Sequence, residues 1–315
     1  MIAIMRLSIV STLYNSAPHL LEFYERLTQC AQDITHDYEM ILVNDGSPDA
    51  SLELAVELHE KDQRIRVIDL SRNFGHHKAK MTGLQHARGE YVFLIDSDLE
   101  EPPETLKRFW DEMQRARDLD VVFGVQEKRK GGLFERVSGA VFYKIINWFG
   151  DVKIPENFLT VRLMTRHYTQ SLVRYQEREM EFSVLTELVG FRKKSMVVDK
   201  SSTSPTNYSL VKKFNLMVNA ITSSTNRPLW VIFYLGLGIT LVSSIYVIQL
   251  LVNRMFYGME VVEGWTSIMV AIFFIGGLNM FVLGVIGIYL SKIFIESKQR
   301  PYTVIRKIYE ARPEE

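Results

Sequence analysis

From its start to about residue 205, the chain alternates between short apolar, β-branched runs and longer stretches with helical spacing. The apolar runs predict strands over 6–13, 38–43, 65–70, 91–95 and 120–125. The stretches with helical spacing predict one helix that begins at 48 or 49 and others over 18–33, 76–87 and 102–118. This alternation is typical of an α/β fold, in which helices cover both faces of a mostly parallel sheet.

Two long apolar segments follow, over 229–252 and 265–290, and neither contains Asp, Glu, Lys or Arg. At 1.5 Å per residue each is long enough, as a helix, to cross a hydrocarbon core of about 30 Å. Basic residues flank the pair on its outer sides: Lys212, Lys213 and Arg227 before it, and Lys292, Lys298, Arg300, Arg306 and Lys307 after it. The positive-inside rule therefore predicts a multi-pass protein with both termini cytoplasmic and the short loop 253–264 outside.

The chain thus divides into a soluble domain over 1–205, a juxtamembrane amphipathic segment over 206–228, two transmembrane helices over 229–290 and a basic tail over 291–315. Basic aromatic stretches over 134–149 and 208–221 are typical of helices in the headgroup plane, although packing on the soluble core explains the first equally well. Glycines 276, 277, 284 and 287 offer close-packing faces for a homo-oligomer.

Charge and cysteine content narrow the functional classes. Lys and Arg together number 37, as do Asp and Glu, and this balance argues against a general nucleic-acid binder. The single cysteine, Cys30, excludes an internal disulfide and a cysteine-rich metal site.

Polar residues follow three of the predicted strands: Tyr14-Asn15, Asn44-Asp45-Gly46 and Asp96-Ser97-Asp98. Ligands of parallel sheets bind beyond the carboxyl ends of strands, so these residues are expected to form one site. Asp96 and Asp98 suit a divalent metal, Mg²⁺ or Mn²⁺, which in turn suits a diphosphate. The alternatives are a turn and helix cap at 44–47 and a solvated acidic turn at 96–104.

Three motifs resemble those of family 2 glycosyltransferases, in order along the chain. They are Asn44-Asp45-Gly46-Ser47-Pro48-Asp49, Arg72-Asn73-Phe74-Gly75-His76-His77-Lys78 and Asp96-Ser97-Asp98-Leu99-Glu100-Glu101-Pro102-Pro103-Glu104. More narrowly, these motifs and the ending around Gly287-Ile288-Tyr289-Leu290 resemble the polyprenyl-phosphate glycosyltransferases, which include dolichol-phosphate mannose synthase and bactoprenol glucosyltransferases. The resemblance implies a Rossmann-like GT-A fold, a nucleotide-sugar donor and inversion at the anomeric carbon. It also implies a lipid phosphate acceptor, here undecaprenyl phosphate or a similar lipid, and a place in a bacterial-type inner membrane.

The expected site residues follow from these motifs and from the chemistry. The residues expected to bind the donor are Tyr14, Asn15, Asp45, Arg72, Lys78 and Asp96. Asp98 and Asp96 are expected to bind the metal and to act in catalysis, and Arg162 is expected to contact a phosphate or the sugar. The residues expected to bind the acceptor phosphate are Lys128, Arg129 and Arg136. Adjacent His76 and His77 diverge by roughly 100° on a helix, so they are not expected to form a metal pair.

The chain departs from the family pattern at three places. At the first, Ser16 follows Asn15 where relatives commonly carry an acidic residue. Thr160 stands where many relatives carry Asp, and a basic element near the first long helix is eroded to Ser201–Asn207. A carboxylate general base is therefore in doubt, but a phosphate monoester is largely a dianion at neutral pH and needs none. These departures leave open a non-catalytic membrane scaffold; a processive polysaccharide synthase is less consistent with only two spanning helices.

Overall fold

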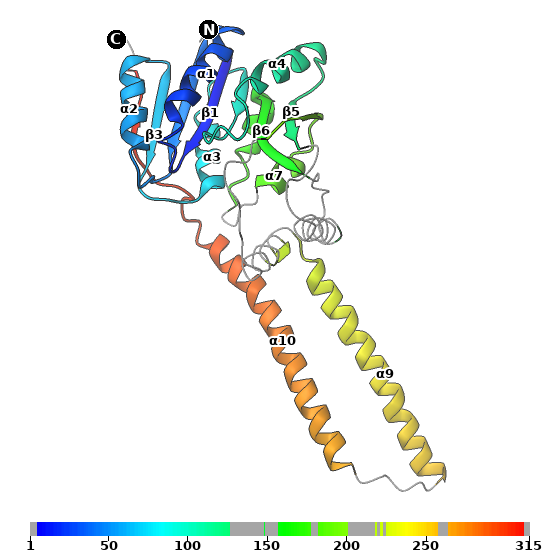
Figure 1. Cartoon of the computed structure of the whole chain (residues 1–315). Helices are drawn as coiled ribbons and strands as arrows, with labels where there is room; N and C mark the ends of the chain where they lie inside the picture. The colour runs from blue at the N-terminus through cyan, green and yellow to red at the C-terminus, as the bar shows by residue number, and fades with distance from the viewer. Residues whose placement is uncertain are drawn as a thin grey trace.

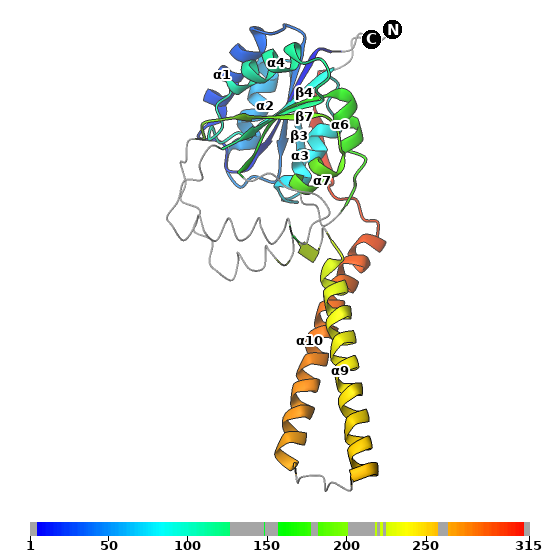
Figure 2. The ribbon, with the colours of Figure 1, turned by 90° about the vertical axis from the view of Figure 1, so that its right-hand side faces the viewer.

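The computed structural model describes residues 5–126, 157–177, 182–200, 225–257 and 264–311, with the isolated residues 148, 218, 221 and 222. These residues form an α/β head from which two long helices project side by side (Figures 1 and 2).

Among the described residues, the head contains the strands and the shorter helices. In chain order they are β1 (Leu7–Leu13), α1 (Leu20–Gln32), β2 (Tyr38–Asn44), α2 (Ser51–Lys61), β3 (Ile65–Leu70), α3 (His76–Gln85), β4 (Tyr91–Leu94), α4 (Thr105–Arg115), β5 (Val121–Val125), β6 (Phe158–Thr165), α6 (Arg166–Leu172), α7 (Phe182–Leu188), β7 (Lys193–Val197) and β8 (Ile305–Tyr309). All five predicted strands and all four predicted helices of the first 125 residues are present.

The strands form one sheet in the order β7-β5-β6-β4-β1-β2-β3-β8. Strands β1 to β4 run parallel, with β1 between β2 and β4. Strand β6 pairs antiparallel with both β4 and β5, and β8 pairs antiparallel with β3. Strands β2 and β3 therefore lie on one side of β1 and β4 lies on the other side, which places a topological switch point between β1 and β4.

Apolar side chains pack on both faces of the sheet. Helices α1, α2 and α4 cover one face, with Phe23, Leu58 and Phe109 in its core. Helix α3 and the short helices α6 and α7 cover the other, with Leu84, Tyr168 and Leu185 in its core. Burial on both faces explains why β1, β2 and β3 are buried at every position. The mostly parallel α/β fold is confirmed.

Strands β6, β7 and β8 were not expected from the sequence. Strand β8 lies within the predicted basic tail, and its Arg306 and Lys307 are exposed. Lysine and arginine are common on edge strands, where they oppose pairing with other molecules. The sequence of such an edge strand therefore resembles that of an unstructured charged tail.

The two long helices are α9 (Arg227–Tyr257) and α10 (Trp265–Ser297). Within them, Arg227–Tyr246 and Phe274–Ser297 are long and apolar enough to cross a membrane, and neither window is buried against the rest of the protein. The predicted amphipathic stretches 134–149 and 208–221 lie almost wholly outside the described residues, so the predicted boundary at residue 205 stays a prediction.

Candidate functional site

The loops after β1, β2 and β4 meet at the carboxyl edge of the sheet, on the side of the head that faces the long helices (Figure 1). Asp45, directly after β2, is buried, and its two carboxylate oxygens accept hydrogen bonds from the amides of Phe74 (2.7 Å) and Gly75 (3.0 Å). Burial raises the pKa of Asp45, and these two amides oppose the rise. Asp45 therefore fixes the loop that joins β3 to α3.

The middle residue of the Asp96-Ser97-Asp98 motif connects two strand ends. The buried Ser97 hydroxyl donates to the carbonyl of Thr12 (2.9 Å) and shares a hydrogen bond of 2.8 Å with the Ser16 hydroxyl. These bonds tie the end of β4 to the end of β1 across the switch point. They hold the flanking residues Asp96 and Asp98 in a fixed position at this edge.

The two aspartates have different surroundings. Asp98 is exposed, and its Oδ1 accepts a hydrogen bond from the Glu100 amide (3.0 Å). Desolvation raises the pKa of Asp98, the Glu100 amide lowers it, and the charges of Asp96 and Glu100 raise it further. An added cation would relieve this accumulation of negative charge, although Lys200 already pairs with Glu100 at 2.7 Å.

Asp96, in contrast, already has cationic and polar neighbours from α3. Its Oδ1 lies 3.2 Å from the Lys80 ammonium and 3.3 Å from His76 Nε2. Burial alone raises the pKa of Asp96, but the charge of Lys80 and the hydrogen bond with His76 outweigh burial and hold that pKa well below its ordinary value. His76 Nδ1 is also hydrogen-bonded to Thr12 Oγ1 at 3.1 Å.

Lys80 is the site residue that the sequence analysis missed. Its side chain is only 3% exposed, and its ammonium donates a 2.9 Å hydrogen bond to Thr160 Oγ1. The sequence contains one indication of its role: Lys80 stands four residues after His76, so the two side chains lie on the same face of α3. His76 itself lies beside Asp96.

Residues from β6 complete the floor of the site. The Thr160 amide donates to Glu101 Oε1 (3.1 Å), while Glu101 Oε2 is buried without a hydrogen-bond partner among the described residues. Burial, followed by the charge of Asp96, raises the pKa of Glu101 to about 7.

Arg162 is buried, and its guanidinium donates to the carbonyls of Thr160 (3.0 Å) and Leu159 (3.2 Å). The guanidinium also lies 4.6 Å from the ring centres of both Phe158 and Phe182. Burial lowers the pKa of Arg162 to about 10, which leaves the group charged at neutral pH. These contacts position β6; a contact of Arg162 with phosphate or sugar stays a prediction.

The remaining predicted donor residues surround the same edge. Tyr14 is exposed after β1, and the Asn15 amide donates to Ser47 Oγ at 2.8 Å, which links the β1 and β2 loops. Arg72 lies over the ring of Phe74 at 4.1 Å, and Lys78 is partly buried in the first turn of α3. The predicted acceptor residues Lys128, Arg129 and Arg136 lie outside the described residues.

The acidic residues suit a divalent cation that is shared with a ligand. Among the described residues, no three His, Cys, Asp or Glu side chains converge as a metal cage. Mg²⁺ commonly takes one or two protein carboxylates and completes its coordination with phosphate oxygens and water. Exposed Asp98 fits that arrangement.

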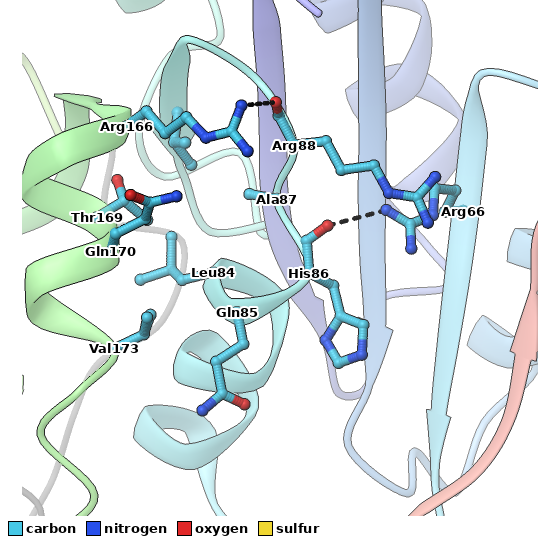
Figure 3. A pocket seen from close by; sticks show the side chains of 11 residues that line it. Arg66, Leu84, Gln85, His86, Ala87, Arg88, Arg166, Thr169, Gln170 and Val173 are labelled. Carbon is cyan, nitrogen blue, oxygen red and sulfur yellow. Dashed lines mark hydrogen bonds between the residues drawn. The ribbon is translucent and has the colours of Figure 1, made fainter. Parts of the chain in front are cut away.

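A separate cavity of about 350 Å³ lies at the opposite, amino-terminal edge of the sheet (Figure 3). Arg66 and Arg88 line it, and both pair with Glu310 beyond β8, at 3.1 and 3.2 Å. Arg166 donates to the Arg88 carbonyl, as the dashed line in Figure 3 shows. Because Arg66 also pairs with the buried Glu39 at 2.9 Å, the ion pairs at this cavity serve to join β8 to the sheet.

Comparison with known proteins identifies the family. Residues 8–176 match the profile of glycosyl transferase family 2. The chain is 48% identical to a protein of Mycobacterium tuberculosis named as a putative glycosyltransferase, over 97% of this chain and 89% of that one. It is 29% identical to the bactoprenol glucosyl transferase of Shigella phage SfII, over 98% of this chain and all of that one.

Among solved structures, glucosyl-3-phosphoglycerate synthase from Mycobacterium tuberculosis in complex with uridine diphosphate aligns with a TM-score of 0.48 and 14% identity, over 69% of this chain and 79% of that one. The family match covers more than half of the chain, including the strands and loops that carry the candidate site. The protein belongs to glycosyl transferase family 2 and is a glycosyltransferase.

Proposed function

We propose that this glycosyltransferase moves a sugar, with inversion, from a nucleoside-diphosphate donor to a polyprenyl phosphate at a membrane surface. Several full-length relatives are named bactoprenol glucosyl transferase, which supports a polyprenyl acceptor. Family membership favours an enzyme over the scaffold alternative.

The donor binds, in this proposal, at the switch point between β1 and β4. Asp45 shapes the loop 72–75 through the amides of Phe74 and Gly75, and this loop forms one wall of the nucleotide site. Asp98 faces the diphosphate, while Tyr14 and Asn15 border it from the other side. A divalent cation held by Asp98 would neutralise charge on the departing nucleoside diphosphate.

The acceptor phosphate attacks the anomeric carbon of the sugar as the bond to the diphosphate breaks. Its second pKa is near 6, so it arrives largely as a dianion and needs no proton removed by the protein. Thr160 at the family's usual Asp position is compatible with this chemistry. The protein then acts by positioning the two substrates and stabilising charge.

The membrane part of the proposal is supported by the two long helices. Large apolar side chains such as Phe233, Tyr234, Phe274 and Phe281 are more than half exposed, which is costly in water and favourable in lipid. The basic residues on their outer sides favour a cytoplasmic head and cytoplasmic termini.

One observation carries the proposal: the carboxyl ends of the strands that precede Asp45, Asp96 and Asp98 lie on the side of the head that faces the two apolar helices (Figure 1). A lipid phosphate at the membrane surface would meet the donor there. The test is a screen of nucleotide sugars with the purified full-length protein and undecaprenyl phosphate, read by the mass of the lipid product. One sugar per lipid is expected; a polymer would instead support a processive synthase, and no lipid product with any donor would contradict the proposal.

Asp98→Asn sharpens the test. Loss of the carboxylate is expected to lower transfer by a factor of at least 100, while the protein stays folded. Asp111→Asn, an exposed aspartate on α4, is the matched control and is expected to keep full activity. Equal activity of both variants would refute the role of Asp98.

A further inference from the structure

Lys80 is an unusual residue for its position. A buried ammonium is costly unless a nearby carboxylate compensates its charge. Lys80 reaches Asp96 Oδ1 at 3.2 Å and Thr160 Oγ1 at 2.9 Å, and its side chain is almost fully buried. Asp96 supplies that carboxylate, so the ion pair is formed by the protein's own residues.

Asp98 differs from Asp96 in this respect. It is exposed, and among the described residues it takes part in no ion pair. A cation that approaches the motif thus meets one available carboxylate and one that is already compensated by Lys80. The two aspartates are not equivalent ligands.

We propose that Lys80 is a positioning residue that keeps Asp96 in an internal ion pair, so that a divalent cation is held by Asp98 and the donor diphosphate together. This inference rests on the proposed function for the identity of the donor. It implies that the metal binds weakly to the protein alone and strongly with a nucleoside diphosphate, because the diphosphate supplies ligands that Asp96 does not.

Thr160 fits this arrangement. An aspartate at this position, as the family resemblance leads one to expect, would place a second carboxylate within reach of Lys80 and compete with Asp96. A threonine hydroxyl accepts the Lys80 hydrogen bond without adding charge. The ammonium then forms its ion pair with Asp96, and threonine at position 160 adds no carboxylate to those of Asp96 and Glu101, which already act on Lys80.

The test measures Mn²⁺ binding to the purified full-length protein by the electron paramagnetic resonance signal of free Mn²⁺, alone and with UDP or GDP. The natural protein is expected to bind Mn²⁺ at least tenfold more tightly with the matching nucleotide. Lys80→Met releases Asp96, so the variant is expected to bind Mn²⁺ without nucleotide at least tenfold more tightly than the natural protein. Lys107→Met removes an exposed lysine that lies 3.6 Å from Asp33, and it is expected to change neither affinity.

Unchanged nucleotide-free Mn²⁺ affinity in folded Lys80→Met would overturn the inference. Should that variant fail to fold, the double variant Lys80→Met/Asp96→Asn removes both charges of the ion pair, so that neither partner is left charged and unpaired. The double variant is expected to keep Mn²⁺ affinity with nucleotide within about threefold of the natural protein; loss of Mn²⁺ binding with nucleotide still bound would show that Asp96 is a metal ligand. Failure of both UDP and GDP to bind would restrict the donor to other nucleoside diphosphates, and the nucleotide-free comparison would still test Lys80.

Discussion

The guanidinium of Arg306 donates a 2.7 Å hydrogen bond to the carbonyl of Ser71, and so connects the last strand of the chain to the loop that Asp45 organises. Ser71 in turn donates its amide to the Val304 carbonyl, and Arg306 lies 3.5 Å from Asp69. The proposed nucleotide loop is therefore supported by residues that lie more than 200 positions later in the sequence.

Arg306→Ala is expected to weaken binding of the nucleoside diphosphate by roughly two- to fivefold, because one exposed charge-assisted contact to the loop is lost. Isothermal titration calorimetry with UDP or GDP measures the change. Lys307→Ala is the control, since adjacent residues of a strand point to opposite sides. Equal weakening in both variants would mean that the strand as a whole, and not the Arg306 contact, supports the loop.

Gly46→Ala is expected to disrupt the site. Gly46 has a φ of +62°, and an added Cβ would lie 2.5 Å from the amide nitrogen of Asn73 and 2.6 Å from the carbonyl carbon of Arg72. Because these atoms belong to backbone, the loop 72–75 must move, and nucleotide affinity should fall by more than tenfold.

Gly190→Ala is the comparison for the Gly46 variant. Its φ is +74°, but among the described residues its added Cβ meets only one atom, the Leu188 carbonyl oxygen at 3.7 Å. It should lose about 1 kcal/mol of stability from backbone strain and keep nucleotide affinity. Thermal unfolding measures the backbone strain in both variants, and calorimetry measures the effect on nucleotide binding of the Cβ contact with loop 72–75. Similar nucleotide affinities of the two variants would contradict the proposal that loop 72–75 forms part of the nucleotide site.

Glu101→Gln is expected to stabilise the protein at pH 8 and to leave it unchanged near pH 4.5. Since the pKa of Glu101 is raised to about 7, the folded protein retains a proton there that the unfolded chain has released. The free energy of unfolding of the natural protein therefore falls as pH rises from about 4.5 to 7, by up to about 3 kcal/mol.

Thermal unfolding at several pH values measures this effect of Glu101. The control is Glu57→Gln, an exposed glutamate on α2. A stability difference between Glu101→Gln and the natural protein that is the same at pH 5 and pH 8 would rule out a proton bound at Glu101.

The sequence predicted the parts of the fold that depend on local pattern. Strands β1 to β5 are apolar runs between turn residues, and the positions of Asp45, Asp96 and Asp98 directly after strands sufficed to group them. Strand β8 was not predictable in this way, because Arg306 and Lys307 give it the composition of a tail. Lys80 was missed because its role depends on β6, which pairs with β4 and brings Thr160 beside α3. No periodicity in α3 separates this buried lysine from the more exposed Lys78.

The pairing of β8 with β3 also changes what counts as a separable part of this protein. Helices α9 and α10 are an insertion between two strands of one sheet, and not an appendage at its end. A soluble fragment that stops before α9 would leave β3 as an open edge, with Arg66 and Arg88 deprived of Glu310. An excised head would therefore need the segment after α10 joined back to it, through a short linker across the gap left by the helices.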